Sequence, residues 1–296
     1  MNDVAAKHGL PWLIGAIETH FSDLRRRPAD VHAALASALA QCGAGHLPER
    51  IAKAGTRIAA AVNAAADASP ELAYHNRHHT AEAVLAMGWL LEAARRAGMI
   101  DPDLAALGVL AMLGHDIFHD GSAPGNGELE ERSAAAVEVL AAEAGLTARE
   151  RAVIRAVIAG TNPCRIGENA ARAASMLPTG PLGHHVDLLI AMANEADVLA
   201  SLMPSLGAAL TADLARERAA CGDSRADEVM TFASRLRFLR GYEQQTEAAR
   251  ALGLDAIVRQ QIEAFGRFGT TAEEGAAALD MLRREDALRR YQAALN

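Results

Sequence analysis

Cysteine and aromatic residues are scarce in this chain of 296 residues, which has three cysteines and only 4% aromatic residues. Cys42, Cys164 and Cys221 are widely separated, odd in number and without a C-x-x-C spacing. This pattern fits reduced thiols better than a disulfide framework. We therefore expect a cytoplasmic protein.

An excess of positive charge is also missing, because 29 Lys and Arg residues face 37 Asp and Glu residues and the formal net charge is −8. A nucleic-acid-binding surface would normally appear as a basic stripe. Residues 1–10 contain no apolar stretch typical of signal peptides, and apolar runs such as 105–113 are far too short to span a membrane. The sequence favours a small-molecule substrate over nucleic acid or membrane as partner, and it leaves a homodimer open.

Runs of β-branched residues bounded by turns are missing too, whereas alanine is abundant. Strands have little to build on in such a chain, so we expect an all-α fold. The length suits one large domain or two modest ones. We expect an N-terminal helical subdomain or cover at 1–69 and a catalytic helical domain at 70–296, joined in one continuous globular unit.

Apolar residues recur at helical spacing along most of the chain, with proline, glycine and capping residues at the segment boundaries. Thr147 and Glu150, for example, form a capping-box pattern at the start of one segment. Residues 121–127 and 167–181 are predicted to be loops, because glycine or proline interrupts the pattern there. The expected helices are 11–23, 28–42, 48–68, 77–97, 101–113, 129–144, 147–159, 186–202, 225–249, 254–265 and 271–295.

Five of the eleven histidines lie in two short stretches of the chain: His75, His78, His79, His115 and His119. Residues four apart in a helix share a face, with Cβ atoms about 6 Å from each other. His75 therefore pairs with His79, and His115 pairs with His119. Two helix faces then present imidazoles together with the carboxylate of Asp116.

Imidazole and carboxylate ligands suit zinc, iron or manganese, and a carboxylate can also bridge to a harder cation such as magnesium. Asp116 is the natural bridging candidate. Asp197 lies in the largely apolar segment 186–202, where a carboxylate is costly unless something pairs with it. A single His-Asp dipeptide is usually an ordinary hydrogen-bonded pair, but these elements together predict a metal site.

These motifs, in this order, resemble the signature of the HD-type phosphohydrolases, and within them most of all the catalytic domain of class I cyclic nucleotide phosphodiesterases. The resemblance covers about residues 70–240 and implies a compact multi-helix bundle of the HD-domain or phosphodiesterase type. It rests on Tyr74-His75-Asn76-x-x-His79, His115-Asp116-x-x-His119-x-Gly121 and Ala196-Asp197.

The resemblance implies two divalent cations. In the family, two histidines and two aspartates hold a tightly bound cation, which would be zinc, iron or manganese. The matching positions are His79, His115, Asp116 and Asp197. The aspartate of the His-Asp pair also bridges to a second cation, magnesium or manganese, which is held mainly by water.

The same resemblance implies catalytic residues. His75, one turn before the first ligand, matches the general acid that protonates the departing alkoxide. His119 matches a histidine near the attacking water or the phosphate. Glu130 is the best match to the acidic partner of that histidine, with Glu131 as an alternative, and a solvated helix face is equally open for either glutamate.

The substrate-binding segment departs from the family pattern. Ala200 stands where class I enzymes usually have asparagine, and Arg235 stands where they have the glutamine that holds the purine. Phe238 still matches the aromatic clamp on the base, so Tyr74, Phe238 and Arg235 are the candidate substrate-binding residues. Because buried polar groups discriminate strongly between ligands, nucleobase selectivity does not carry over.

The expected function is a dinuclear metal-dependent phosphodiesterase, in which a water between the cations loses a proton and attacks phosphorus. A 3′,5′-cyclic nucleotide is the leading substrate. Three alternatives stay open: an HD-type phosphomonoesterase or nucleotidase, a mixed-valence di-iron oxygenase, and a non-catalytic, metal-stapled nucleotide sensor. The oxygenase would need further histidine ligands, for which His119 and His184 or His185 are the candidates, while the retained His75 weighs against the sensor.

Overall fold

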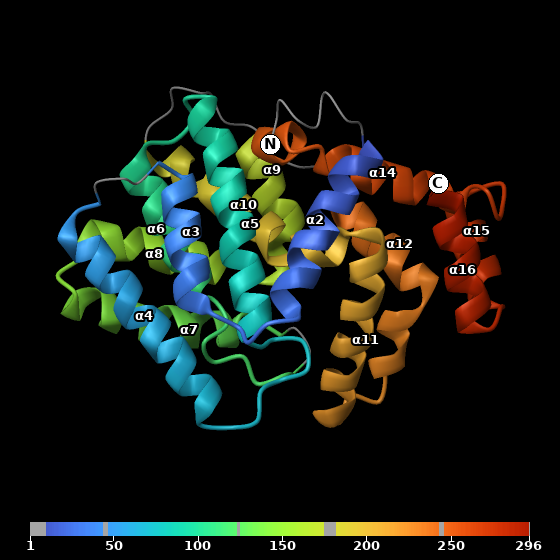
Figure 1. The fold of residues 1–296 in the computed structure, drawn as a ribbon, viewed down its shortest axis with the longest axis horizontal. Helices are drawn as coiled ribbons and strands as arrows, with labels where there is room; N and C mark the ends of the chain where they lie inside the picture. Colours follow the sequence, from blue (N-terminus) through green and yellow to red (C-terminus); the bar gives the residue numbers. More distant parts are fainter. Residues whose placement is uncertain (1–9, 44–46, 123–124, 175–181, 243–245, 296) are drawn as a thin grey trace.

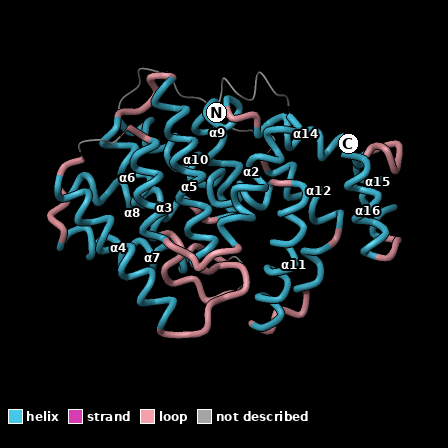
Figure 2. The backbone as a smooth tube through the Cα atoms, viewed as in Figure 1, coloured by secondary structure: helices cyan, strands magenta, loops and turns pink. Residues whose placement is uncertain are grey.

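The computed structural model describes residues 10–43, 47–122, 125–174, 182–242 and 246–295. Within these ranges the chain consists of helices and connecting loops without a strand (Figure 2), which confirms the all-α prediction. The helices, with η marking short 3-10 helices, are α2 Leu10–Arg25, α3 Val31–Gln41, α4 Glu49–Asp67, α5 Arg77–Arg96, α6 Pro102–Gly114, α7 Glu128–Glu143, α8 Ala148–Gly160, η1 Pro163–Arg165, α9 Ile166–Ala174, α10 Leu182–Leu202, α11 Pro204–Ala220, η2 Ala226–Met230, α12 Phe232–Gly241, α13 Glu247–Ala251, α14 Leu254–Phe265, α15 Ala272–Asp280 and α16 Arg284–Leu295.

Helices α5, α6 and α10 pack against one another in the middle of the molecule (Figure 1). Helix α3 covers a further face of α5, and α8 packs against both α6 and α10. Gly108 of α6 makes this packing tight, because a Cβ added there would lie 2.8 Å from a methyl carbon of Leu189 in α10. Side chains on these three helices are therefore held in fixed relative positions.

The N-terminal helices brace α5, which carries the first group of histidines. Gly88 allows α3 to approach closely, since an added Cβ would lie 2.8 Å from the Cα of Ala38. Helix α2 is tied to α5 by an ion pair in which Arg25 Nε lies 2.5 Å from Glu82 Oε1, and the Glu82 side chain is buried. Whether residues 1–69 form a separate subdomain stays a prediction.

Helices α10 and α11 meet at a sharp corner. Residues 185–202 and Pro204–Ala220 are bent by 98° relative to each other, and they have the length and apolar composition of a membrane span only as a pair. Taken singly, no helix in the described ranges is long and apolar enough to cross a membrane.

Several predicted helix boundaries are confirmed. The side chain of Asp101 accepts the backbone N–H of Leu104 and caps α6, which has proline in its first turn. Thr147 and Glu150 form the expected capping box at the start of α8. Local side-chain hydrogen bonds of this kind depend on residues only a few positions apart, so sequence patterns reveal them.

The loop predicted at 167–181 is wrong for its first part, because residues 166–174 form helix α9. Asn169 explains this, since its Nδ2 donates to Gly160 O and Asn194 Oδ1 and so ties α9 to α8 and α10. Residues 175–181 lie outside the described ranges.

Two predicted long helices are interrupted in the structure. Segment 225–249 contains η2, α12 and the start of α13, because Thr231 caps α12 with a side chain that accepts the N–H of Ser234. Segment 271–295 is divided into α15 and α16. Asp280, the last residue of α15, accepts the N–H groups of Phe232 and Ala233, which anchors the end of α15 to the start of α12.

Candidate metal centre

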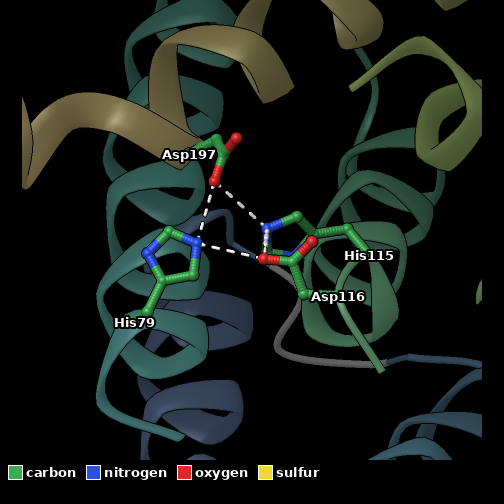
Figure 3. A group of neighbouring side chains, drawn as sticks. All are labelled: His79, His115, Asp116 and Asp197. Carbon is green, nitrogen blue, oxygen red and sulfur yellow. Dashed lines mark hydrogen bonds and ion pairs between the residues drawn. The ribbon is translucent and has the colours of Figure 1, made fainter. Parts of the chain in front are cut away.

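Four side chains from three helical segments point toward one another: His79, His115, Asp116 and Asp197 (Figure 3). The side chain of Asn76 caps α5 by accepting the N–H of His79, which places His79 in the first turn. His115 and Asp116 follow the last turn of α6, and Asp197 lies within α10. We call this group the candidate metal centre.

The nitrogen and oxygen atoms of the candidate metal centre are spaced like ligands of one ion. His79 Nε2 lies 3.2 Å from Asp116 Oδ2 and 3.0 Å from Asp197 Oδ1. His115 Nε2 lies 3.2 Å from each of the same two oxygens. For bonds of about 2.0–2.1 Å, ligand atoms in octahedral or tetrahedral geometry are roughly 2.9–3.4 Å apart. The spacing therefore fits a divalent cation.

The hydrogen bonds of the two histidines point to the same conclusion. His115 Nδ1 lies 2.8 Å from Met112 O, and because a carbonyl can only accept, Nδ1 carries the proton. In its neutral form, which a bound cation requires, His115 presents a lone pair at Nε2 toward the carboxylates, as metal-binding histidines do. His79 Nε2 is buried and makes no hydrogen bond, although two carboxylate oxygens lie within 3.2 Å. The positions of these side chains therefore favour a shared cation over direct hydrogen bonds among them.

The charges of the candidate metal centre depend on each other. Burial alone would lower the pKa of His79, but the carboxylates of Asp116 and Asp197 outweigh burial and raise it to about 9. Burial would likewise raise the pKa of Asp197, whereas the two histidines hold it well below its usual range. The pocket therefore strongly favours positive charge beside its carboxylates, which a bound cation supplies as well as a proton does.

Glu217 on α11 is a residue of the candidate site that the sequence analysis missed. Its side chain is buried, and its Oε2 accepts the backbone N–H groups of Tyr74 at 2.7 Å and His75 at 2.9 Å. Its Oε1 accepts a hydrogen bond from His75 Nδ1–H. The arginines on either side of Glu217 in the sequence resemble a solvated helix face, so no local signal marks it.

His119 stacks on His75, with ring centroids 3.5 Å apart and ring planes 16° from parallel. Its Nδ1 accepts the N–H of Gly121 at 3.0 Å, so the neutral ring carries its proton on Nε2. Burial lowers the pKa of His119, and the charge of His75 lowers it further. His119 is therefore a neutral N–H donor beside His75.

Together, His75, His119 and Glu217 form a second group of close nitrogen and oxygen atoms, which we call the proton-holding group. Glu217 already accepts three N–H groups, and the lone pair of His119 Nδ1 is used by Gly121. Few lone pairs of this group are therefore left for a cation.

Tyr74 and Phe238, two candidate substrate-binding residues, lie on different parts of the same cavity. Tyr74 is buried, its hydroxyl pairs with Ser201 Oγ at 2.8 Å, and its ring centroid lies 5.0 Å from that of His79. Phe238 lies on α12 beside Tyr242, with ring centroids 5.4 Å apart. Substrate contact stays a prediction for both residues.

Arg235 lines the cavity, but its guanidinium is turned into the protein. It donates to the backbone carbonyls of Ser201, Leu202 and Met203 at 2.5, 3.1 and 3.3 Å, and to Gln261 Oε1 at 2.6 Å. These carbonyls lie where α10 turns into α11, so Arg235 secures that corner. Its role in substrate binding stays a prediction, and most of its donors are already engaged.

The two candidate acidic partners of His119 point in different directions. Glu130 lines the cavity, and burial together with the charges of Asp116 and Asp197 raises its pKa. Glu131 instead forms an ion pair with Arg155. Of the two, Glu130 has the surroundings of a residue near the candidate metal centre.

The histidines considered as extra metal ligands are not grouped with the centre. His185 Nδ1 lies 2.9 Å from Met99 O, between the start of α10 and the end of α5. The side chain of His184 lies outside the described residues. His119 belongs to the proton-holding group.

A cavity of about 950 Å³ opens from the candidate metal centre. Asp197, His75, His119 and Glu130 line it, together with residues of α11 and α12. Its volume lies at the upper end of the roughly 300–1,000 Å³ that is usual for small-molecule sites. The two groups of titratable residues therefore open onto a space large enough for a nucleotide-sized ligand.

No protein-family model matches this sequence, and neither does any curated protein. Among solved structures, the chain is similar to the phosphodiesterase domain of the RhoPDE fusion protein from the choanoflagellate Salpingoeca rosetta. The identity is 13%, the TM-score is 0.45, and the match covers 98% of this chain and 91% of that one. A likeness this weak says nothing about activity, so the function has to come from the residues themselves.

Proposed function

We propose that this protein is a metal-dependent phosphodiesterase. One observation carries the proposal: two groups of side chains meet at one cavity. The first is the candidate metal centre, whose lone pairs are spaced for a cation, and the second is His75, hydrogen-bonded to the buried carboxylate of Glu217. Hydrolysis of a phosphodiester needs both parts, since one activates water and the other protonates the leaving oxygen. The motif order of the sequence supports the same reaction.

The candidate metal centre would hold the cation through His79, His115, Asp116 and Asp197. Bound there, divalent cations supply Lewis-acid chemistry, which lowers the pKa of water and neutralises charge on phosphoryl oxygens. Asp116, whose side chain is 18% exposed, is the residue we propose to be shared with a second cation. Met112 keeps the proton of His115 on the ring nitrogen that faces away from the site.

Protons are delivered by the proton-holding group. Glu217 orients His75 through Nδ1, which leaves Nε2 as the atom that donates to the departing oxygen. Gly121 orients His119 in the same manner, so that its Nε2–H donates to a phosphoryl oxygen. Burial lowers the pKa of His119 and the stacked His75 lowers it further, so His119 serves as a neutral N–H donor and does not compete with His75 for one role.

The alternatives lack a specific observation in their favour. A di-iron oxygenase needs further histidine ligands, and His185, one of those considered, faces Met99 O instead. A metal-stapled sensor has no use for His75 and Glu217 held beside the cavity. A phosphomonoesterase would use the same groups, and the choice between ester classes is part of the test below.

The test is metal-dependent turnover of bis-p-nitrophenyl phosphate, a diester, compared with p-nitrophenyl phosphate, a monoester. Chelated protein should be inactive, and zinc, manganese or magnesium should restore hydrolysis, with the diester preferred. His185→Asn is a matched control that should retain full activity, because His185 contacts Met99 away from the centre. Absence of metal-dependent turnover of any ester would overturn the proposal, and two irons per chain with a visible absorption band would favour the oxygenase.

A further inference from the structure

Tyr74 is held by hydrogen bonds at both of its ends. Its hydroxyl lies 2.8 Å from Ser201 Oγ, in the last turn of α10, and its backbone N–H donates to Glu217 Oε2 at 2.7 Å, near the end of α11. These two helices are bent by 98° relative to each other. Tyr74 therefore connects the two helices on either side of that corner.

The ring of Tyr74 lies against one histidine of each group. Its centroid is 4.7 Å from that of His75, with the two rings edge to face, and 5.0 Å from that of His79, with the ring planes 36° apart. Because Tyr74 is buried among closely packed neighbours, a shift of its ring would be passed on to both imidazoles. Tyr74 thus links the candidate metal centre to the proton-holding group.

Ser201, the partner of the Tyr74 hydroxyl, lies on the same helix as a proposed metal ligand. Asp197 and Ser201 are four residues apart in α10, and residues at this spacing share a helix face. Both residues line the cavity. The hydroxyl of Tyr74 is therefore tied to the turn of α10 that follows Asp197.

The backbone of Ser201 is itself fixed by Arg235. The guanidinium of this arginine donates to the carbonyl of Ser201 at 2.5 Å and to those of Leu202 and Met203 at 3.1 and 3.3 Å. Gln261, which is fully buried, donates to Leu202 O at 2.7 Å and accepts from Arg235 at 2.6 Å. The last carbonyls of a helix have no partner within it, so these two side chains hold the end of α10 in place.

We infer that Ser201 and Arg235 are positioning residues that act through Tyr74. Arg235 fixes the end of α10, Ser201 holds the hydroxyl of Tyr74, and the ring of Tyr74 sets the spacing of the two imidazoles beside it. Those imidazoles belong to the proposed general acid His75 and the proposed metal ligand His79. The effect on catalysis rests on the proposed function, whereas the effect on metal affinity does not.

Metal affinity gives the first test. Ser201→Ala and Tyr74→Phe remove the same hydrogen bond and leave the rest of each side chain in place. We expect each variant to bind zinc about 3- to 10-fold more weakly, the effect of one lost hydrogen bond. Competition with a chromophoric chelator measures this on the full chain without turnover. Ser234→Ala is the matched control and should bind zinc normally, because Ser234 lines the same cavity but is not the partner of the Tyr74 hydroxyl.

The double variant shows whether the two side chains act as a pair. Because one and the same hydrogen bond is lost, Tyr74→Phe combined with Ser201→Ala should bind zinc no more weakly than either single variant. Losses that multiply would mean that the two residues act separately, and unchanged zinc affinity in both single variants would mean that they do not position His79. Either result would overturn the inference.

The leaving group of the ester gives the second test. At saturating zinc, Ser201→Ala and Arg235→Gln should slow hydrolysis of an ester with an alkoxide leaving group about 3- to 10-fold. The loss should be smaller for p-nitrophenyl esters, because the displaced group is the general acid His75. A purely structural role would lower Tm and leave the ratio of the two rates unchanged, which would overturn the inference. Arg235→Lys, which keeps the charge but not the planar fork, replaces Arg235→Gln if that variant does not fold.

The two proposals fail in different ways. Weaker zinc binding by the single variants of a protein that hydrolyses no ester would keep the positioning residues and refute the proposed function. Metal-dependent hydrolysis by variants with normal zinc affinity and an unchanged ratio of rates would keep the function and refute the positioning residues. An unaltered protein that binds neither zinc nor manganese would refute both.

Discussion

The candidate metal centre and the proton-holding group are built from the same residue types and lie side by side, yet they are suited to different tasks. His75 and His79 are one helical turn apart in the sequence, and their ring centroids are 5.4 Å apart. His79 directs a nitrogen without a hydrogen bond toward two carboxylates, whereas His75 donates a hydrogen bond from Nδ1 to Glu217. Neither the type of residue nor its position along the chain separates them.

The two groups differ in what is hydrogen-bonded to the ring nitrogen that faces away from the site, or in whether that nitrogen has a partner. A carbonyl acceptor at Met112 fixes the proton of His115 on Nδ1 and frees Nε2 for a cation. An N–H donor at Gly121 does the reverse for His119 and leaves Nε2 as a donor. Backbone groups next to the site thus fix which ring nitrogen of His115 and which of His119 carries the proton when the ring is neutral.

The largest effect is expected for Asp116→Asn, which removes the carboxylate that both histidines of the centre face. Metal content and activity should be lost together, and the free energy of unfolding should fall by about 3–5 kcal/mol, as when one partner of a buried charged pair is removed. Metal analysis, turnover and thermal unfolding measure these changes. Full metal content in this variant would remove Asp116 from the ligand set.

A smaller and different effect is expected for His75→Ala. Metal content should be retained, and hydrolysis of an ester with an alkoxide leaving group should slow by about 10²- to 10⁴-fold, the usual contribution of a general acid. The loss should be much smaller for p-nitrophenyl esters, whose leaving group needs little protonation. Glu217→Gln should show the same dependence on the leaving group with a smaller loss, because it affects the rate only through His75.

Equal losses on both kinds of ester would contradict this assignment, and so would loss of metal from the His75→Ala protein. Either result would place His75 among the metal ligands. The distinction between metal-binding and proton-donating histidines would then not hold for His75.

The four residues of the candidate metal centre could be predicted from the sequence because each lies in a short, spaced motif. His115 and Asp116 are adjacent, and Asp197 stands out as an acid in an apolar helix. Their convergence requires only that α5, α6 and α10 pack together, which their apolar faces promote. Metal binding itself stays a prediction, since proximity alone does not test it.

Glu217 and Arg235 could not be assigned in this way, because their partners are distant in the sequence. Glu217 accepts from a backbone N–H 142 positions away, and nothing near it in the sequence marks it as buried. Arg235 matches a substrate-binding position by spacing, but the corner between α10 and α11 engages its guanidinium. The helix at 166–174 was missed for the same reason, since Asn169 stabilises it through contacts with α8 and α10.

The smallest effect concerns pH and separates the two groups by their protons. Without a cation, the pKa of His79 is raised to about 9 and that of His115 is also raised, whereas the pKa of His119 is lowered. A histidine whose pKa is raised in the folded state stabilises the fold. This stabilisation is fully present below the unfolded-state pKa of about 6.5 and is lost as the pH rises through about 9. Chelated protein should therefore become less stable between pH 6.5 and 9, and His119, whose pKa is lowered, should not contribute to this loss.

The size of that change can be bounded from His79. A shift from about 6.5 to about 9 corresponds to at most about 3 kcal/mol, or roughly 5–10 °C in Tm for a chain of this size. Metal should act in the opposite sense, because protons compete with the cation for Nε2, so the rise in Tm on adding zinc should grow from pH 6.5 to pH 9. Thermal unfolding of chelated and zinc-loaded protein across this range measures both trends, with His79→Gln as the variant that should lose much of the slope. If the Tm of chelated protein rises or stays constant over this range, the carboxylates do not hold His79 protonated. The inference that Asp116 and Asp197 favour a positive charge beside them would then be wrong.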